Sequence, residues 1–524
     1  MTVPEVFRSP LPDVEIPETP LTSYVFRHVE RLADRVAIVD GPTGRSYTYA
    51  GLYGAARRVA GGLLASGMET GDVLAVLSPN IPEYAMVFHG VAIGGGAVTT
   101  INPTYTAGEV TRQLVDSGAK YLVTIEQFLD TALAAARASG VERVFVLGDA
   151  QDGARSFFEL LASDPADQVD IDTGEHVVVL PFSSGTTGLP KGVQLTHRNL
   201  VANLAQTDPL ATTTEEDVIL AVLPFFHIYG MQVLMNGVLF RGARTVTMPR
   251  FDLAEFLGHI ETHGVTRVAA VPPMVLALAK HPMVADYDLT SLIQVGSGAA
   301  PLSPDVERLA AERTGAEIIQ GYGLTETSPV THTTLPGQAR SGSIGVLIPN
   351  TEARLVDPAT GDDLGESEPG ELWLRGPQVM KGYLNEPDAT RRSIDHEGWL
   401  HTGDVGYVDS DGHWFITDRL KELIKYKGFQ VAPAELEAVL VAHPAIADAA
   451  VIPLLDEEAG EIPKAFVVTQ PGEELTADEV MAHVAGRVAP HKRVRAVEFI
   501  DEIPKSLSGK ILRRVLRERE DAGV

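Results

Sequence analysis

The feature that most constrains the fold is a regular alternation of short apolar strands and helical segments through the first part of the chain. Apolar residues recur at helical spacing over residues 52–68, and the run Asp72-Val-Leu-Ala-Val-Leu is a short apolar stretch that ends in a Pro/Asn turn. The alternation continues at residues 121–125 (strand), 128–136 (helix), 144–147 (strand), 221–224 (strand), 268–271 (strand) and 318–320 (strand). Such a pattern is typical of parallel α/β sheets.

The pattern changes in the second half of the chain. Residues 352–356, 370–375 and 414–416 are short strand-like runs separated by Gly, Pro and Asp turns, which favours an antiparallel or barrel-like portion. Because 524 residues are too many for one hydrophobic core, at least two domains are expected. We predict an α/β protein whose large N-terminal domain combines parallel α/β sheets with a small barrel-like part, followed by a hinge and a small α+β C-terminal domain, at residues 1–417, 418–421 and 422–524.

Composition excludes several functional classes. The chain has no cysteine, which excludes disulfides, thiolate metal sites and a cysteine nucleophile, and fits a reducing cytosol. Its formal net charge of −28 argues against a nucleic-acid binder, because surfaces that bind phosphate backbones are usually basic. No apolar run approaches the roughly 18 to 20 residues that cross a bilayer, and the first residues lack the pattern of a secretory signal. We therefore expect a cytoplasmic protein without stable membrane association, with its cations concentrated wherever it binds an anion.

A loop rich in glycine and hydroxyl residues follows an apolar strand at residues 178–182. It reads Ser-Ser-Gly-Thr-Thr-Gly-Leu-Pro-Lys-Gly over residues 183–192. Glycines let backbone N–H groups converge on an anion, hydroxyls add donors and Lys191 adds charge, so the loop predicts a phosphate site. It is not a Walker loop, because Pro190 stands where that motif requires glycine. Taken alone, such a stretch is usually a flexible surface loop.

Two further motifs place polar side chains directly after predicted strands. Leu-Pro-Phe-Phe-His-Ile-Tyr-Gly contains His227 and Tyr229, and Gln-Gly-Tyr-Gly-Leu-Thr-Glu contains Tyr322, Thr325 and Glu326. A tyrosine ring can stack on an adenine, a threonine hydroxyl can bind phosphate, and a glutamate oxygen suits Mg²⁺. Each motif also has a structural explanation, as a packed core histidine and as a glycine turn before a capped helix.

The remaining motifs lie near and beyond the expected hinge. Asp404, in Trp-Leu-His-Thr-Gly-Asp, can accept two hydrogen bonds from ribose hydroxyls. A run rich in Asp, Arg and Lys spans residues 418–437, and Pro-Lys-Ser-Leu-Ser-Gly-Lys-Ile-Leu-Arg-Arg contains Lys510 near the end of the chain. Charged runs of this kind are most often solvent-exposed faces of helices or strands. The functional interpretation therefore depends on the order and completeness of all the motifs together.

Taken together, these strings resemble the adenylate-forming superfamily of acyl-CoA synthetases, adenylation domains and luciferases, and residues 418–437 are most similar to 4-coumarate–CoA ligases. The resemblance implies ATP, Mg²⁺ and coenzyme A as ligands and Lys510, His227 and Thr325 as catalytic residues. It implies Glu326 as the Mg²⁺ ligand and a coenzyme A contact at Arg250, Lys427 and Gly428. The implied ATP and AMP contacts are Ser183, Ser184, Gly185, Thr186, Thr187, Gly188, Lys191, Gln320, Gly321, Tyr322, Thr325, Asp404, Arg419, Lys421, Lys425, Gln430 and Lys510.

The resemblance also implies a reaction in two steps. A carboxylate attacks the α-phosphate of ATP to give acyl-AMP and pyrophosphate, and the thiol of coenzyme A then displaces AMP. Lys510 serves the first step, whereas the Lys427-Gly428 loop serves the second. Because both lie in the small C-terminal domain, we expect that domain to be mobile and to rotate about residues 418–421.

The acid is predicted from the acyl pocket that the resemblance implies. Val233 stands where a serine is usual in the plant ligases, and Gly296 where a larger residue is usual. We expect 4-coumarate or a related hydroxycinnamate, with a medium-chain fatty acid or another aryl acid as the alternative. A luciferase-like or adenylate-only enzyme is a further alternative, and the sequence leaves the oligomeric state open. The implied pocket residues are His227, Ile228, Tyr229, Val233, Gly296, Ala299, Gly321, Gly323, Pro329 and Val330.

Overall fold

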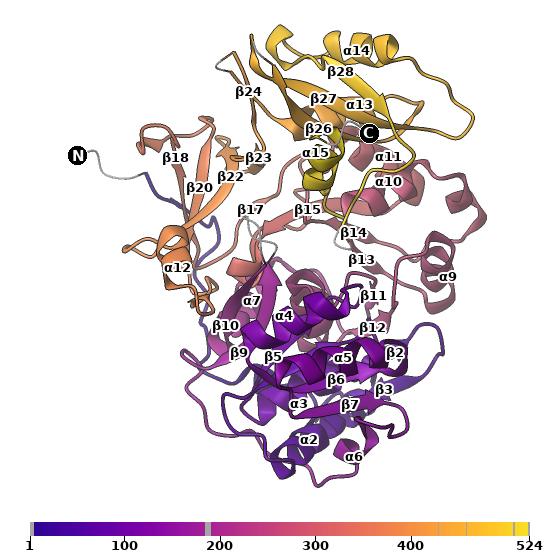
Figure 1. Cartoon of the computed structure of the whole chain (residues 1–524), viewed down its shortest axis with the longest axis vertical. Coiled ribbons are helices and arrows are strands. Elements are labelled where there is room, and N and C mark those ends of the chain that lie inside the picture. The colour runs from indigo at the N-terminus through magenta and orange to yellow at the C-terminus, as the bar shows by residue number, and fades with distance from the viewer. Residues whose placement is uncertain (1–4, 184–189, 428, 457, 507–508, 522–524) are drawn as a thin grey trace.

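The structure is a computed structural model that describes residues 5–183, 190–427, 429–456, 458–506 and 509–521. Four sheets build the fold, and the chain returns to some of them, since β1 (Phe7–Arg8) joins a sheet whose other strands follow residue 350. Figure 1 shows the last sheet and its helices as a unit at one end of the molecule, above the sheets of the N-terminal part. The fold is therefore α/β with a large N-terminal and a small C-terminal domain, as predicted.

The first sheet has eight strands, parallel over six of them. In spatial order they are β21 (Gly382–Tyr383), β10 (Lys191–Thr196), β9 (Val177–Ser183), β5 (Ala97–Ile101), β4 (Val73–Leu77), β6 (Ala119–Ile125), β7 (Arg143–Leu147) and β8 (Arg155–Ser156). The antiparallel pairs of this sheet are β9 with β10 and β10 with β21, and the other neighbouring strands are parallel. Two helices, α4 (Ala107–Ser117) and α5 (Leu129–Ser139), cover one face of this sheet and bury a cluster of small and branched apolar residues against it.

The second sheet has nine strands. In spatial order they are β17 (Val346–Leu347), β16 (Val330–Thr333), β15 (Glu317–Gly323), β14 (Gln294–Ser297), β13 (Arg267–Ala270), β11 (Val218–Ala221), β12 (Arg244–Thr247), β2 (Val36–Asp40) and β3 (Ser46–Thr48). The six strands from β15 to β2 are parallel. The helices that follow or connect these strands are α8 (Gly237–Phe240), α9 (Leu253–His263), α10 (Pro272–Lys280) and α11 (Pro304–Thr314).

Helix α3 (Pro82–Ile93) holds the two large sheets together. It contacts β4 and β5 of the first sheet and β2 of the second, and all its residues are buried. Because the sequence PEYAMVFHGVAI is apolar on nearly every side, this helix is stable only where protein surrounds it. At Gly90 a Cβ atom would lie 2.6 Å from Val59 of helix α2 (Tyr49–Ala65), so a glycine is needed where the two helices touch. The largest core of the protein extends across both sheets through this layer.

The predicted barrel-like part is an antiparallel sheet. It contains β1 (Phe7–Arg8), β18 (Glu352–Val356), β20 (Gly370–Arg375), β22 (Leu400–Val408) and β23 (Trp414–Arg419), with β19 (Asp363–Leu364) at the side of β18. Strand β20 alternates buried and half-buried residues, as expected for a strand with one face on a core. The buried side chains of this sheet pack around Trp414.

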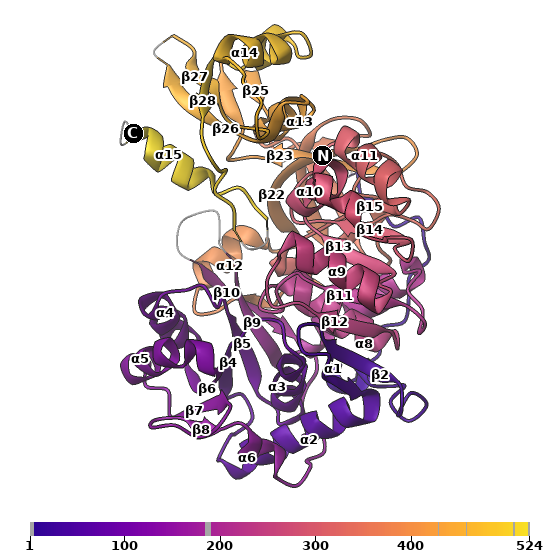
Figure 2. The ribbon, with the colours of Figure 1, turned by 90° about the vertical axis from the view of Figure 1, so that its right-hand side faces the viewer.

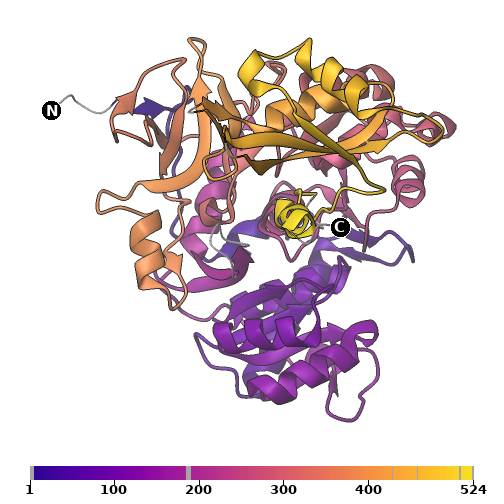
Figure 3. The same ribbon diagram turned by 45° about the horizontal axis from the view of Figure 1, so that its top comes forward.

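The C-terminal domain is a five-stranded sheet with helices on both faces. Its strands are β25 (Phe429–Val431), β24 (Ile424–Tyr426), β27 (Gly460–Thr469), β26 (Ile446–Asp456) and β28 (Ala496–Phe499). Alternate residues of β26 and β27 face opposite sides, and therefore two separate apolar clusters form. One lies under α13 (Pro433–Val441) and α14 (Ala477–Ala485), and the other under α15 (Arg513–Asp521). Figures 2 and 3 show α15 on the side of the sheet that faces the rest of the molecule.

Several predicted bounds differ from the observed ones. The helix predicted over 52–68 begins at Tyr49, because Thr48 accepts a hydrogen bond from the Gly51 N–H and caps it. The strand predicted at 221–224 is β11, which ends at Ala221. The apolar run continues through Val222 and Leu223, both buried, so burial does not mark the end of the strand. Within the described residues, no helix combines the length and the apolar character needed to cross a bilayer.

The expected hinge lies at the edge of the antiparallel sheet. Asp418 and Arg419 still pair with β22, and the next strand, β24, begins at Ile424. The link between the two domains therefore falls on residues 420–423 in this conformation, and the hinge at 418–421 stays a prediction.

Candidate active site

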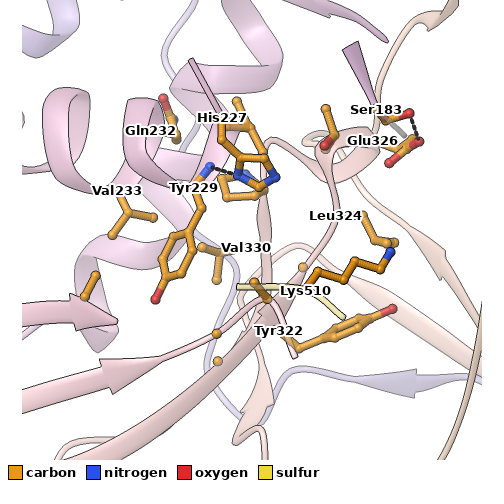
Figure 4. Close-up of a pocket in the computed structure, with 18 of the residues that line it drawn as sticks. Ser183, His227, Tyr229, Gln232, Val233, Tyr322, Leu324, Glu326, Val330 and Lys510 are labelled. Atoms are coloured by element: carbon orange, nitrogen blue, oxygen red, sulfur yellow. Dashed lines mark hydrogen bonds between the residues drawn. The ribbon is translucent and has the colours of Figure 1, made fainter. Parts of the chain in front are cut away.

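A large cavity, of about 1520 Å³, lies at the carboxyl ends of β9, β14 and β15, between them and the antiparallel sheet and C-terminal domain. Figure 4 shows some of the residues that line it. In open α/β sheets ligands bind at the carboxyl ends of strands. All four sheets or the segments next to them contribute lining residues. The cavity therefore contains the predicted phosphate, nucleotide and acyl regions together.

At one end of the cavity a glutamate is held by two hydroxyl groups. The Ser183 hydroxyl donates to Glu326 Oε1 at 3.1 Å, and the Tyr383 hydroxyl donates to the same oxygen at 2.9 Å. Burial and the Glu326 charge raise the pKa of Tyr383, so its phenol stays a donor. The Lys191 ammonium lies 5.1 Å from the centre of the Tyr383 ring. A carboxylate fixed by neutral donors next to a lysine can hold a cation and phosphate groups.

The residues around Glu326 come together because β9 pairs with β10 and β10 pairs with β21. Ser183 ends β9 and pairs with Lys191, which begins β10, so both sides of the predicted phosphate loop are placed. The loop residues Ser184, Gly185, Thr186, Thr187 and Gly188 lie outside the described residues. Tyr383 was not predicted, since it is far from the loop in sequence and reaches it only because β21 pairs with β10.

The nucleotide region contains a buried carboxylate with two partners. The Tyr322 hydroxyl donates to Asp404 Oδ2 at 2.6 Å, and Arg419 Nε lies 3.2 Å from Asp404 Oδ1. The pairing of Asp404 with Arg419 across β22 and β23 sets this contact. Burial, followed by the charge of Asp404, raises the pKa of Tyr322. Gln320, which also lines the cavity, uses its amide on Leu302 and on Glu307.

Lys510 enters the same cavity from the C-terminal domain. Its side chain extends into the space past Tyr322 (Figure 4). Burial, and then the charge of Arg419, lowers the pKa of Lys510 to about 8. The preceding Gly509 has φ +74°, and a Cβ there would lie 2.6 Å from Val271 Cγ2. Glycine is thus required for the loop to come close enough to the N-terminal domain to insert the lysine.

His227 lies between the nucleotide region, where Lys510 enters, and the acyl pocket. Its Nδ1 accepts the backbone N–H of Tyr229 at 3.3 Å, so the proton of the neutral ring is on Nε2. Burial, followed by the positive charge of Lys510, lowers the pKa of His227 to about 4. The imidazole is therefore neutral near pH 7 and can donate one hydrogen bond from Nε2.

The acyl wall predicted from the sequence is assembled around Tyr229. This residue begins η3 (Tyr229–Asn236), a π-helix, and its hydroxyl donates to the Gly296 carbonyl at 3.5 Å. Its ring packs on Gly298, where a Cβ would lie only 3.0 Å from a ring atom. The other predicted residues that line the same cavity are Ile228, Val233, Ala299, Gly321, Gly323, Pro329 and Val330, and Thr325 and Lys421 from the nucleotide set also line it.

The predicted coenzyme A residues are not brought to the cavity. Arg250 is exposed beyond β12, and Lys427 sits at the turn between β24 and β25, where its ammonium pairs with Glu458 at 2.5 Å. Gly428 lies outside the described residues. Lys425 and Gln430 pair with each other on this hairpin and also lie away from the cavity. The orientation seen here presents Lys510 rather than Lys427.

A contact between the two domains accompanies this orientation. The Lys280 ammonium, at the end of α10, donates to the Val441 carbonyl at 2.7 Å and to the Ile446 carbonyl at 3.4 Å. Val441 is the last residue of α13, where a helix dipole favours a cation. This contact was not predicted, because it joins two motif-free segments that are distant in sequence.

Comparisons with known proteins agree with this architecture. The model of the AMP-binding enzyme family matches residues 25–384, and the model of the AMP-binding enzyme C-terminal domain matches residues 435–510. The chain is 47% identical to 4-coumarate–CoA ligase 3 of Oryza sativa subsp. japonica over 533 residues, which covers 99% of this chain and 96% of the rice protein.

Solved structures of related enzymes have the same fold. The anthranilate CoA ligase AuaEII in complex with anthranoyl-AMP matches with a TM-score of 0.89 and 26% identity, over 98% of this chain and 99% of that one. ATP-bound MatB from Rhodopseudomonas palustris matches with a TM-score of 0.86 and 30% identity, over 96% of this chain and 99% of that one. Apo MatB gives a TM-score of 0.77 at 29% identity, over 96% and 99%.

Proposed function

Because the chain belongs to the AMP-binding enzyme family, we propose that it is an ATP-dependent acid–CoA ligase that acts on 4-coumarate or a related hydroxycinnamate. The observation that carries the proposal is the half-buried Lys510, which lies in one cavity with the Tyr322–Asp404–Arg419 cluster and the Tyr229 pocket. The 47% sequence identity to the rice 4-coumarate–CoA ligase, over 99% of this chain, supports the reaction class and the substrate.

In the first step two anions must approach each other. The carboxylate oxygen of the acid attacks the α-phosphorus of ATP, and the bond to pyrophosphate breaks. We assign to Lys510 the bridging of these two groups, since the C-terminal domain extends its side chain into the cavity between the nucleotide and acyl regions. His227, neutral and with its proton on Nε2, would donate a hydrogen bond at the same place. Catalysis here is alignment and charge stabilisation rather than proton transfer.

The nucleotide would lie along the cavity between two anchored groups. Asp404, oriented by Tyr322 and Arg419, would accept the ribose hydroxyls. Ser183, Lys191 and Thr325 would face the phosphates. Mg²⁺ fits Glu326, because Mg²⁺ is commonly held by one or two carboxylates together with substrate phosphates. When bound, the ion would neutralise the leaving pyrophosphate.

In the second step the thiol of coenzyme A attacks the acyl carbonyl and AMP leaves. We propose that the C-terminal domain rotates between the steps, which removes Lys510 and presents the hairpin around Lys427. The better agreement with ATP-bound MatB than with apo MatB supports assigning the present orientation to the first step. The polar contact of Lys280 with α13 would stabilise this orientation and break on rotation. A cytoplasmic location, where both cosubstrates are available, remains a proposal that cell fractionation would test.

The substrate assignment is tested by turnover on a panel of acids. With ATP, Mg²⁺ and coenzyme A, we expect a clear preference for 4-coumarate or cinnamate over benzoate and octanoate. Tyr229→Phe should lower kcat/KM for 4-coumarate about three- to tenfold, because the para-hydroxyl of this acid loses its hydrogen bond to the Tyr229 hydroxyl. Cinnamate has no para-hydroxyl, so its kcat/KM should be nearly unchanged. Coupled AMP release measures each rate. A preference for octanoate would agree with an acid–CoA ligase but refute the hydroxycinnamate assignment. Release of pyrophosphate without formation of a thioester would identify an adenylate-only enzyme.

The protonation of Lys510 predicts a pH dependence of the first step. Since its pKa is lowered to about 8, the required ammonium is lost as the pH rises through about 8 rather than near the ordinary lysine value. The kcat/KM for adenylate formation, followed by pyrophosphate release, should fall over that range. In Lys510→Arg the guanidinium stays charged, so any residual activity should lose this decline. An unchanged decline in that variant would contradict the assignment.

The contact of Lys280 predicts a selective effect on the two steps. Lys280→Met should slow adenylate formation roughly five- to tenfold, because the orientation that presents Lys510 loses a charged hydrogen bond at a helix end. Thioester formation from chemically supplied acyl-AMP and coenzyme A should not slow, and Lys280→Arg should restore the first step. Lys381→Met, which breaks a pair with Glu175 within the N-terminal domain, is the matched control. Equal losses in both steps would indicate a general structural role.

The Mg²⁺ assignment is tested by titrating the metal. Glu326→Gln should raise the Mg²⁺ concentration that gives half-maximal pyrophosphate release by about tenfold or more. Tyr383→Phe, which leaves the carboxylate but removes one of its hydroxyl donors, should raise it less. If both variants titrate like the parent enzyme, Glu326 does not bind the ion.

A further inference from the structure

The acyl pocket does not end at the point where Tyr229 meets Gly296. The same cavity is lined, beyond this contact, by residues from the earlier parts of β13, β14 and β15 and from the segment after the π-helix. These residues have no role in the two-step reaction proposed above. The extension therefore bears on which acids the site can accept.

Gly296 has no side chain where one would fit. Its φ lies outside the left-handed region, and a Cβ there would have no neighbour closer than 3.8 Å. Nearby glycines differ, because a Cβ at Gly298 would lie 3.0 Å from the Tyr229 ring and one at Gly323 would lie 1.8 Å from the Pro329 carbonyl. Packing thus requires glycine at Gly323 and leaves a side chain at Gly298 crowded by the Tyr229 ring, whereas Gly296 has room for a Cβ. What the glycine at Gly296 provides is open space.

One wall of the extension follows from the strand register. Gln294 lies two residues before Gly296 in β14 and so shares its face of the sheet. It pairs with Arg267 in β13 and with Glu317 in β15. Its side-chain carbonyl accepts from Arg267 Nη1 at 2.8 Å, and its amide donates to Glu317 Oε2 at 2.9 Å. A polar row therefore crosses three strands about 7 Å beyond Gly296.

The opposite wall follows from helical spacing. Val233, Gly237 and Arg241 come at intervals of four residues after Tyr229, and all of them line the cavity. The Arg241 guanidinium donates to the Gly237 carbonyl at 3.2 Å, and its side chain is 13% exposed. Two small or medium residues, Val233 and Gly237, thus separate Tyr229 from a second guanidinium at the far end.

The far end is polar but close to neutral. Arg267 Nε lies 3.2 Å from Asp217, and Arg241 Nε lies 3.5 Å from Asp208. Glu317 adds a carboxylate on the same face. A second carboxylate on the acid would therefore meet no uncompensated cation there, whereas a hydroxyl or ether oxygen can hydrogen-bond to the polar row.

We propose that the acyl pocket continues past Gly296 and that the enzyme accepts aryl-propenoic acids whose para substituent is a short chain ending in a neutral oxygen. The proposal rests on the ligase function proposed above. The chain would pass between Gly296 and Val233 and place its terminal oxygen at Gln294. A substituent of about five heavy atoms spans this distance.

Two acids of equal length test the proposal. They are 4-(3-hydroxypropoxy)cinnamate and 4-butoxycinnamate, which differ only in the terminal atom. In the parent enzyme, kcat/KM for the hydroxypropoxy acid should lie within about tenfold of that for 4-coumarate and exceed that for the butoxy acid about three- to tenfold. If 4-coumarate is turned over and the hydroxypropoxy acid is not, the pocket is closed at Gly296 and the proposal fails. If 4-coumarate itself is not turned over, the proposed function fails first.

Variants separate the opening from the polar row. Gly296→Met should reduce turnover of the hydroxypropoxy acid at least about tenfold more than that of 4-coumarate, and Gly296→Ala should have a smaller effect in the same direction. Gln294→Leu should abolish the advantage of the hydroxypropoxy acid over the butoxy acid, with 4-coumarate turnover as its measure of intact folding. Equal losses on all acids in Gly296→Met, or an unchanged preference in Gln294→Leu, would overturn the proposal.

Discussion

The need to bring two anions together inside a strongly acidic chain governs the proposed site. With a formal net charge of −28, the protein as a whole repels ATP and a carboxylate, so the attraction must be local. Among the cations that line the cavity, Lys191 comes from β10, Arg419 from β23 and Lys510 from the C-terminal domain. Removal from water strengthens the attraction between such a cation and an anion, but it also disfavours the charged form of the cation. For this reason the pKa of Lys510 is lowered to about 8.

The half-buried Lys510, which a separate domain brings into the cavity, explains the form of the contact between the domains. The Lys510 loop comes close only because Gly509 leaves room for Val271, and Lys280 binds the end of α13 by hydrogen bonds. A hydrogen-bonded contact of this kind is specific in geometry and can break without itself exposing apolar surface. This suits a domain that must leave once acyl-AMP has formed, and it fits the absence of Lys427 from the cavity in the present orientation.

The parts of the fold and site that the sequence predicted are those that depend on local pattern. Strand and helix alternation identified the parallel sheets because buried strands are short apolar runs. Tyr322, Glu326 and Lys510 were predicted from complete motifs, and the structure places all three in one cavity. Tyr383 and Lys280 were missed because each acts on a partner that only tertiary packing brings near. The end of β11 was misplaced, since its apolar run continues as a buried loop.

The glycines of the acyl region show where sequence reasoning ends. Gly296 and Gly298 lie two residues apart, and the residue type alone does not say which of them packing constrains. The structure does, since the ring of Tyr229 crowds the Cβ position of Gly298 whereas Gly296 faces open space. A Cβ fits at Gly296, and a larger side chain there would shorten the pocket. Selection of acids by length can therefore change at Gly296 without disturbing the charges that the reaction needs, which separates substrate choice from catalysis within one cavity.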